Sequence, residues 1–567
     1  MATGYGNGSC GIYGLTAQRK GVYTTASGNV TSTAALVWPD VTLDDIKDCW
    51  FGCRFRGSSI GFPGGEGVGC KRSVTYDGNG SATQIRVQYQ VHENKASNNN
   101  WIKCVVVDLT NGADGVYARK VCATYASGAS NSVGHDFGSA SGNSSYDVYD
   151  LCAVPRIVLD EDADWAPYGR QALNDAVVDL NGHKLTAGEL SFETSRTGMV
   201  VNTANSTTAE MRFFTFDGNS ISNGNVNVGT ACIDAANIKL VVDGYGTYYA
   251  ATHQEYRGGT VVDGGTLRPV GNSVAGTLVL GATSGAVQVN ANGILDLNAT
   301  YNYQTYPAFV LNGGVMCNDG GVDFNTQYAL TKGITLTDDS QFQVPRSWGL
   351  INGSYAGLSL DLGGHALAVS INNGKTMYFS NVTASSGTIN ATGAGVWEIR
   401  ADRNGVGFVG TETDVHAECE LRLWGPMSVR DYEAAHTKND ANLGTSPLNV
   451  HGVFKPTTTY FRGVTMQDGS TLDLTAWPEA AGWPIMNAYT CDGEKEVKFA
   501  EADEGETTTV TVKLGDCKVT GGKIFSWASG NDVSRVKFVR GDADNRYSLD
   551  KKDDGLYVCT GIVLIVR

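Results

Sequence analysis

Alternation of apolar and polar residues dominates the first part of the chain. In "TQIRVQYQVH", Ile85, Val87, Tyr89 and Val91 fall on one face and polar residues on the other, which predicts a half-buried strand of an antiparallel sheet. The following "WIKCVVVDLTNGADGVYARKVCATYA" predicts a hairpin, because two β-rich arms flank Asn-Gly and Asp-Gly turn pairs. The one helical pattern is "LDDIKDCW", so we expect residues 1–155 to form a Cys-rich β-sandwich.

The middle of the chain replaces this pattern with very short strands that end in Gly, Asn or Asp. "VDLNGHKL" at 178–185 returns as "LDLGGHAL" at 360–367, and shorter forms are "ILDLNAT" at 294–300 and "TLDLTAW" at 471–477. Strands this short cannot bury a face alone, and turns that need positive φ select Gly and Asn. Stacking one coil on the next solves both problems, so the pattern predicts a parallel β-solenoid (β-helix).

The predicted solenoid covers residues 156–480. At a rung length in the low twenties, this segment would form roughly a dozen rungs. Its leucines should form an inward column, represented by Leu180, Leu185, Leu267, Leu295 and Leu362. Residues 481–567 lose the Gly-Asn phrasing and predict a small antiparallel β-domain that caps the open end of the solenoid. The expected fold class is therefore all-β.

One stretch, "YRGGTVVDGGTLRPVG" at 256–271, states a short phrase twice. It resembles the autotransporter-associated β-strand repeat of bacterial surface proteins. The matching residues are Tyr256, Gly258, Gly259, Thr260, Gly264, Gly265, Thr266 and Leu267. The resemblance covers only the middle of the chain, where "DLNGHKL" is likewise similar to rungs of right-handed β-helix proteins. It implies a passenger-type surface protein built on such a helix.

Charge and hydropathy narrow the set of partners. There are 42 basic and 58 acidic residues, a formal charge of −16, and no Lys/Arg block, which argues against nucleic acid as a partner. No apolar run approaches the roughly 20 residues of a transmembrane helix. The start, "MATGYGNGSCGIYGL", has neither a basic nor an apolar signal region. A removed signal, another export route and a cytoplasmic location all fit this start.

Cysteines favour an oxidising compartment. Of the 13 cysteines, seven precede residue 153, and their spacing matches no zinc ribbon. We expect disulfides, although buried free thiols in a reducing cytosol are the alternative. A hairpin centred on Ala113 would place two of them opposite one another, near the Cβ separation that a disulfide needs, unless a bulge shifts the register. The candidates are that pair, Cys104 and Cys122, together with Cys49, Cys53 and Cys70.

Candidate chemistry is sparse. Polysaccharide-cleaving β-helices need paired carboxylates on adjacent rungs, and the sequence displays no such pair. Four polar residues recur at equivalent repeat positions, which indicates a structural turn role: Asp179, His183, Asp361 and His365. No catalytic residue and no cofactor are therefore predicted. Asp160, Asp162 and Asp164 alternate in a way that could bind calcium, and solvated acidic turns are the default alternative.

Exposed aromatics could bind sugars. In the first domain Trp38, Trp50 and Trp101 are candidates for stacking on glycans, and the alternative places them in the core or in turns. We expect an extracellular or cell-surface structural or adhesive protein whose partners are other copies of itself or surface glycans. The alternatives are a carbohydrate-binding or polysaccharide-degrading protein on the same scaffold, and a viral fibre component. Acids clustered with Arg or Lys would favour an enzyme, stacked aromatics a lectin, and neither a structural rod.

Overall fold

The structure is a computed structural model, and it is nearly all β, with 64% strand, 2% helix and a parallel β-solenoid of about nine turns. This confirms the predicted fold class. The described residues are 17–20, 24–30, 36–46, 50–57, 84–92, 100–127, 146–154, 156–168, 170–172, 177–191, 199–204, 206–216, 220–222, 227–228, 237–250, 256–269, 280, 285–298, 307–320, 328–329, 332–351, 358–380, 382–400, 407–424, 448–456, 461–475, 495–514, 523–527, 530–542 and 548–559. The chain divides into two compact units, unit 1 (Met1–Gln288 with Thr300–Pro307) and unit 2 (Val289–Ala299 with Ala308–Arg567).

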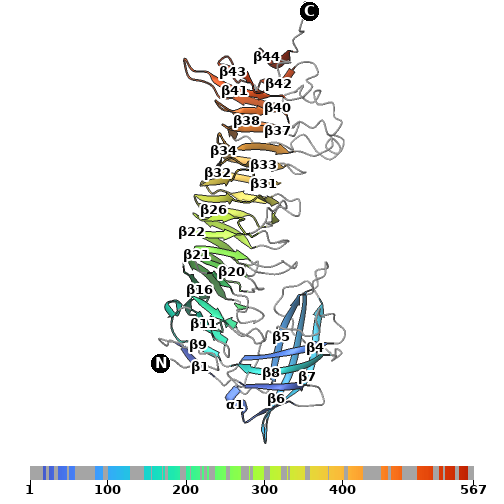
Figure 1. Cartoon of the computed structure of the whole chain (residues 1–567). Helices are drawn as coiled ribbons and strands as arrows, with labels where there is room; N and C mark the ends of the chain where they lie inside the picture. The colour runs from blue at the N-terminus through green and yellow to red at the C-terminus, as the bar shows by residue number, and fades with distance from the viewer. Residues whose placement is uncertain are drawn as a thin grey trace, which may run out of the picture. The chain divides into compact units, whose positions relative to one another are not determined.

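Unit 1 begins with antiparallel sheets, as the alternating pattern predicts (Figure 1). One has the order β2-β8-β4 and the other β3-β7-β6-β5, and the predicted helix is the single turn α1. The elements are β1 (Ala17–Lys20), β2 (Thr24–Val30), β3 (Leu36–Pro39), α1 (Leu43–Ile46), β4 (Trp50–Gly57), β5 (Gln84–His92), β6 (Asn100–Gly112), β7 (Gly115–Ser127) and β8 (Tyr146–Val154).

The rest of unit 1 consists of parallel rungs. Strand β12 pairs with β9 and β15, and β16 pairs with β13 and β19, all in parallel. The elements are β9 (Arg156–Leu159), β10 (Ala163–Asp164), the 3-10 turn η1 (Ala166–Tyr168), β11 (Arg170–Ala172), β12 (Val177–Asp179), β13 (Lys184–Ala187), β14 (Glu189–Ser191), β15 (Met199–Val201), β16 (Ala209–Thr215), β17 (Ser220–Ser222), β18 (Asn227–Val228), β19 (Ile238–Gly244), β20 (Thr247–Ala250) and β21 (Thr260–Pro269).

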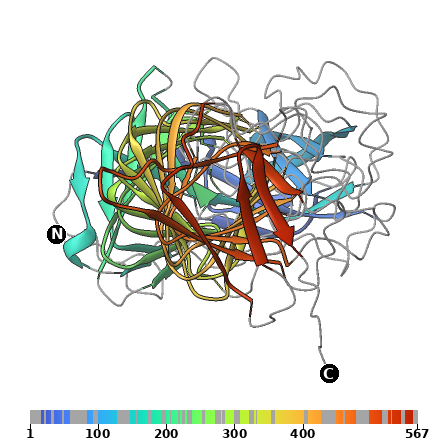
Figure 2. The ribbon, with the colours of Figure 1, turned by 90° about the horizontal axis from the view of Figure 1, so that it is seen from above.

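Unit 2 continues with parallel rungs, and a nine-stranded sheet from β25 to β43 lies wholly within it. Seen from above, its yellow and orange strands lie over one another (Figure 2). The strands are β22 (Ala286–Asp296, which begins in unit 1), β23 (Ala308–Asn312), β24 (Val315–Cys317), β25 (Tyr328–Ala329), β26 (Ile334–Asp338), β27 (Ser340–Val344), β28 (Trp348–Ile351), β29 (Leu358–Asp361), β30 (Ala366–Ile371), β31 (Thr376–Ser380), β32 (Val382–Thr392), β33 (Val396–Arg400), β34 (Gly407–Val415), β35 (Glu420–Trp424), β36 (Leu448–Val450), β37 (Val453–Pro456), β38 (Phe461–Met466), β39 (Thr471–Asp473), β40 (Lys495–Phe499), β41 (Thr508–Lys513), β42 (Lys523–Trp527), β43 (Val536–Arg540), β44 (Ser548–Lys552) and β45 (Gly555–Cys559).

Inward side chains form columns through the rungs. In unit 2 the parallel register aligns Trp348, Met377, Trp397, Leu421, Phe454, Leu472 and Val512, and all seven are buried. The five leucines predicted to point inward are fully buried as well. Such a column removes apolar area from water at about 25 cal/mol per Å², which a lone strand of three to five residues could not do.

Rungs are longer than the low twenties of residues that the sequence predicts. Leu185 pairs with Met211 and Met211 with Leu240, so these rungs take 26 residues (185 to 211) and 29 residues (211 to 240). The turns between the short strands account for the extra length, and they explain why about nine turns form rather than a dozen.

The C-terminal segment differs from the expected antiparallel domain. Past residue 480, β40 pairs in parallel with β38 and β42, and β41 pairs in parallel with β39 and β43. Only β44 and β45 add an antiparallel hairpin, which joins the edge of β42. The Gly-Asn phrasing therefore ends before the parallel ladder does, because rungs need inward apolar residues more than they need one turn sequence.

Candidate functional site

The Asp of the "DL" repeat builds the corner of each rung. Asp179 is fully buried, and its Oδ1 accepts the N–H groups of Asn181 (3.1 Å) and Thr203 (3.0 Å), while Oδ2 accepts the Thr203 hydroxyl (2.7 Å). Asp296 repeats this arrangement with the N–H groups of Asn298 (2.9 Å) and Asp319 (3.0 Å). Each carboxylate thus caps its own turn and bonds the next rung.

The same corners explain the Asn and Gly that follow the repeated Asp-Leu. Asn181 has φ 48°, Asn298 has φ 52° and Gly363 has φ 59°, a left-handed conformation that Asn tolerates and Gly adopts freely. At the third corner, Asp361 Oδ1 accepts the Gly363 N–H at 3.1 Å. The predicted structural role of Asp179 and Asp361 is confirmed by these bonds.

The two recurring histidines also occupy equivalent corners. His183 Nδ1 lies 3.7 Å from Asp162 Oδ1, and His365 Nδ1 lies 3.8 Å from Asp339 Oδ1. In both cases the same Asp oxygen accepts the backbone N–H of the residue after the histidine, at 2.9 and 2.8 Å. The histidines therefore belong to a repeated contact between neighbouring rungs.

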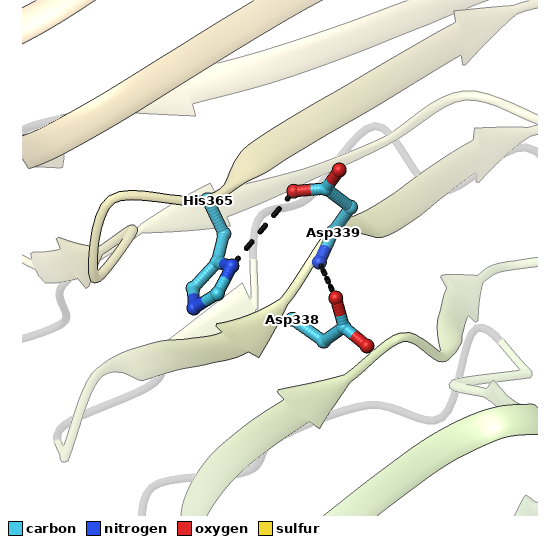
Figure 3. Close-up of side chains that lie close together, drawn as sticks. All are labelled: Asp338, Asp339 and His365. Atoms are coloured by element: carbon cyan, nitrogen blue, oxygen red, sulfur yellow. Dashed lines mark hydrogen bonds and ion pairs between the residues drawn. The ribbon is translucent and has the colours of Figure 1, made fainter.

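At one corner a second acid completes a group that could hold a metal ion. One donor atom each from Asp338, Asp339 and His365 lies within 4.8 Å of the others (Figure 3). Both acids are exposed and the histidine is half-buried. Carboxylate and imidazole donors suit divalent transition metals. Part of this capacity is already used, because Asp338 Oδ1 accepts the Asp339 N–H (2.8 Å) and Asp339 Oδ1 accepts the Ala366 N–H.

The predicted calcium ligands do not converge in this way. Asp160, Asp162 and Asp164 are all exposed, and the one three-donor group found among the described residues is that at Asp338. Asp162 holds the corner at His183, and Asp164 Oδ1 accepts the Ala166 N–H at 3.0 Å. Two of the three acids therefore serve as backbone caps, and the sequence did not single out Asp338 and Asp339.

Of the predicted sugar-stacking tryptophans, Trp38 is fully buried, so it offers no face to a glycan and that prediction is corrected. Burial follows from its place on β3, where it pairs with Val116 of β7. Trp50 begins β4 and Trp101 lies in β6, and their side chains fall outside the described residues.

The predicted pairing of Cys104 with Cys122 is wrong in register. The backbone ladder places Cys104 opposite Thr124 and Cys122 opposite Val106. The hairpin turns over two residues, Ala113 and Asp114, rather than around one, and an irregularity between Val106 and Val107 shifts the register once more. The two positions are therefore diagonal, typically about 7–8 Å apart, too far for a disulfide without backbone movement.

The other disulfide candidates stay predictions. Cys49 and Cys70 lie outside the described residues, and Cys53 is in β4 with its side chain outside them. Three cysteines of the described part are free thiols: Cys317, Cys419 and Cys559. Burial raises the pKa of the Cys419 thiol to about 12, which keeps it protonated and unreactive at neutral pH.

A further cluster lies on the outward face of β16, β19 and β21, and sequence reasoning missed it. Arg212 Nη1 lies 2.6 Å from Asp243 Oδ2 and 2.9 Å from Asp263 Oδ2. Next to it the register places Phe214 opposite Asp243. We name six residues the charged-aromatic surface: Arg212, Phe214, Phe216, Asp243, Tyr245 and Asp263. The available signal was the alternation in "EMRFFTF", but only the register shows which rows meet.

Ion pairs tie this surface to its neighbours. Glu210 accepts from Arg212 Nε (3.0 Å) and Lys239 Nζ (2.7 Å), with Lys184 Nζ at 3.8 Å. Burial acts to raise the pKa of Glu210, but the hydrogen bonds and charges of Lys239 and Arg212 outweigh it and leave that pKa below its usual value. Burial likewise acts to lower the pKa of Arg212, and bonding to Asp243 and Glu210 reverses the effect. The network is held in its charged form.

Rings gather beside these charges. The Phe214 ring centroid lies 5.1 Å from that of Phe216 and 6.5 Å from that of Tyr245, both edge to face. Phe216 is 40% exposed and Tyr245 79% exposed. In the described part of the chain, these two and Val539 are the exposed large hydrophobic side chains.

Comparison with known proteins adds no relative: no protein-family model, curated protein or solved structure matches the chain. Within the described residues, none of the helices has the length and apolar character needed to cross a membrane.

Proposed function

We propose that this chain is an exported bacterial surface or extracellular protein in which the parallel solenoid serves as a structural stem with an adhesive role. A β-solenoid suits such a role in general, and function must be argued from sites rather than from fold. The observation that carries the proposal is the use of the recurring polar residues. Asp179, Asp296 and Asp361 all hold turns or neighbouring rungs, as expected where repetition serves architecture.

The resemblance to the autotransporter-associated repeat belongs to this proposal. Its glycines have roles in stacking, since Gly259 has φ 87° and a Cβ on Gly258 would lie 2.6 Å from the Ile238 carbonyl. Its aromatic residue, Tyr256, is buried and shares a 2.7 Å hydrogen bond with the Thr260 hydroxyl, which donates to the Leu280 carbonyl at 3.0 Å. Burial raises the pKa of Tyr256, so its hydroxyl stays protonated.

The polysaccharide-degrading alternative receives some support from the acids that Arg212 joins, because clustered acids with a cation are what such an enzyme needs. Glycoside cleavage, however, requires a carboxylic acid that is protonated at working pH. Glu210 has the opposite tendency, with its pKa lowered, and Arg212 engages both Asp243 and Asp263. These contacts favour a static role for the cluster.

Surface accessibility in the native host tests the proposal. Intact cells would be treated with a protease that cannot enter them, and the chain would be followed by immunoblotting together with a cytoplasmic marker. We expect the chain to be cleaved, or recovered from the medium, while the marker stays intact. Full protection of the chain, with release only on lysis, would refute an extracellular role.

A further inference from the structure

We propose that the charged-aromatic surface of unit 1 binds a neutral oligosaccharide, with Tyr245 and Phe216 stacking on the apolar face of a sugar ring. The proposal builds on the adhesive role above by naming a ligand class. Its test uses purified protein, so sugar binding and cellular location can fail independently.

Tyr245 is exposed, yet its backbone is firmly held. Its N–H donates to the Thr215 carbonyl at 2.7 Å, and the Gly246 N–H donates to the Thr215 hydroxyl at 3.0 Å. Gly244 has φ 95°, and a Cβ there would lie 2.1 Å from the Thr215 carbonyl oxygen. The turn is thus fixed by the preceding rung, and an aromatic ring presented on a fixed backbone binds with little ordering cost.

The chemistry beside the rings suits sugar hydroxyls. Carboxylates accept hydrogen bonds from hydroxyl groups and the guanidinium donates to them. Asp243 and Asp263 lie next to the ring cluster, with Arg212 between them. An amphipathic ring with one apolar face and a polar edge matches an aromatic patch with a charged border.

Local charge selects a neutral ligand. Three cations, Lys184, Arg212 and Lys239, meet three carboxylates, Glu210, Asp243 and Asp263, so the formal local charge is zero. The chain carries −16 overall. A polyanionic sugar would find no excess of positive charge here.

The patch is small for a protein partner. Aromatic side chains bury about 150–250 Å² each, so even three fully covered rings contribute about 450–750 Å². A stable protein interface buries about 1,200–2,000 Å². A few sugar rings need much less area, and sites of this size bind them through a small number of polar contacts.

Titration calorimetry on the full chain tests the inference, with cellohexaose, mannohexaose and maltohexaose as neutral probes and hexagalacturonate as the anionic one. We expect at least one neutral hexasaccharide to bind, with a Kd raised about tenfold or more by Tyr245→Ala, as for an aromatic hot spot. Tyr378→Ala, in the outward face of β31 in unit 2, is the matched control and should leave Kd within about twofold. An unchanged melting temperature would show that Tyr245→Ala folds.

Four results would overturn the proposal. These are no binding of any neutral probe, tighter binding of hexagalacturonate, equal affinity in Tyr245→Ala, or equal losses in Tyr245→Ala and Tyr378→Ala. Sedimentation across a range of concentrations adds a further arm. Self-association that Tyr245→Ala abolishes, without sugar binding, would assign the surface to a second copy of the chain instead.

Discussion

Single corner residues convert a sequence repeat into a stacking contact. The repeated "DL" phrase was enough to predict that Asp179 and Asp361 serve turns, because Asp bonds to backbone two residues ahead. The bonds from Asp179 to Thr203 could not be predicted. Thr203 lies in "VVNTANSTT", which has no repeat phrase, and only the coil length brings it beside Asp179.

Removing the Asp179 carboxylate should therefore weaken unit 1. Asp179→Ala leaves the buried N–H groups of Asn181 and Thr203 without their acceptor, which costs about 2–4 kcal/mol in unfolding free energy. Urea unfolding followed by circular dichroism would measure the loss. Asp160→Ala, at an exposed site, is the control and should change stability by less than about 0.5 kcal/mol. Equal effects would contradict the stapling role.

The ion pairs of Glu210 predict a pH dependence. Its pKa is lowered in the folded protein from an ordinary value of 4.5, so the ionised form stabilises the fold above that value. This contribution is lost as the pH falls below 4.5 and through the folded pKa. The melting temperature of the wild type should exceed that of Glu210→Gln at pH 7, and the gap should narrow below pH 4.5.

The control for that pH series is Glu504→Gln, because Glu504 is exposed in a turn of unit 2. Its melting temperature should track the wild type at each pH. A gap between wild type and Glu210→Gln that is constant from pH 7 to pH 3 would mean that the pairs with Lys239 and Arg212 contribute nothing as charges.

Strands and rungs were predictable where the local pattern determines them. Short apolar runs between Gly and Asn identify a solenoid and its inward leucines, since no other arrangement buries such strands. Rung length, the parallel pairing of β40 to β43 and the register of the β6–β7 hairpin were not predicted. Each depends on the number of residues in a turn or on one irregular position, and the apolar pattern does not change with either.

The inward column gives the strongest stability prediction. Leu295 is fully buried in β22, whereas Asn292 in the same strand is exposed. Leu295→Asp would place an unpaired charge among apolar side chains, at a cost above about 4 kcal/mol. We expect insoluble protein or the loss of a cooperative thermal transition in unit 2. Asn292→Asp adds the same carboxylate to the same strand and should keep the wild-type transition, and a similar melting temperature for both variants would refute the inward column.

The paired His corners predict the behaviour of the Asp338 group. Because Asp162 and Asp339 make the same backbone bond and the same histidine contact, architecture alone explains the group. His183→Ala and His365→Ala should lower the melting temperature by similar small amounts, and a chelator should change neither variant nor the wild type. A drop with chelator that Zn²⁺ restores, absent in His365→Ala, would instead identify a bound metal.

At the scale of the whole molecule, the fold restricts function without deciding it. A solenoid can serve as a stem, a lectin or an enzyme scaffold, and the side chains on its outer face distinguish these uses. The charged-aromatic surface combines acids with a cation and exposed rings, both of which were named in advance as discriminating features. It could not be located from sequence, because Phe214 and Asp243 meet only through the parallel register.

Binding without cleavage is the outcome that this surface predicts. Hydrolysis would need one carboxyl group as proton donor and a second as base or nucleophile. Arg212 contacts both Asp243 and Asp263, and Glu210 has a lowered pKa with two cations bound to it, so a proton donor is not provided. Prolonged incubation of the chain with cellulose, mannan, starch and polygalacturonate should therefore release no reducing ends above a heat-denatured control. Product formation that Asp243→Asn or Asp263→Asn abolishes, in variants that keep the wild-type melting temperature, would reverse this conclusion and make the surface an active site.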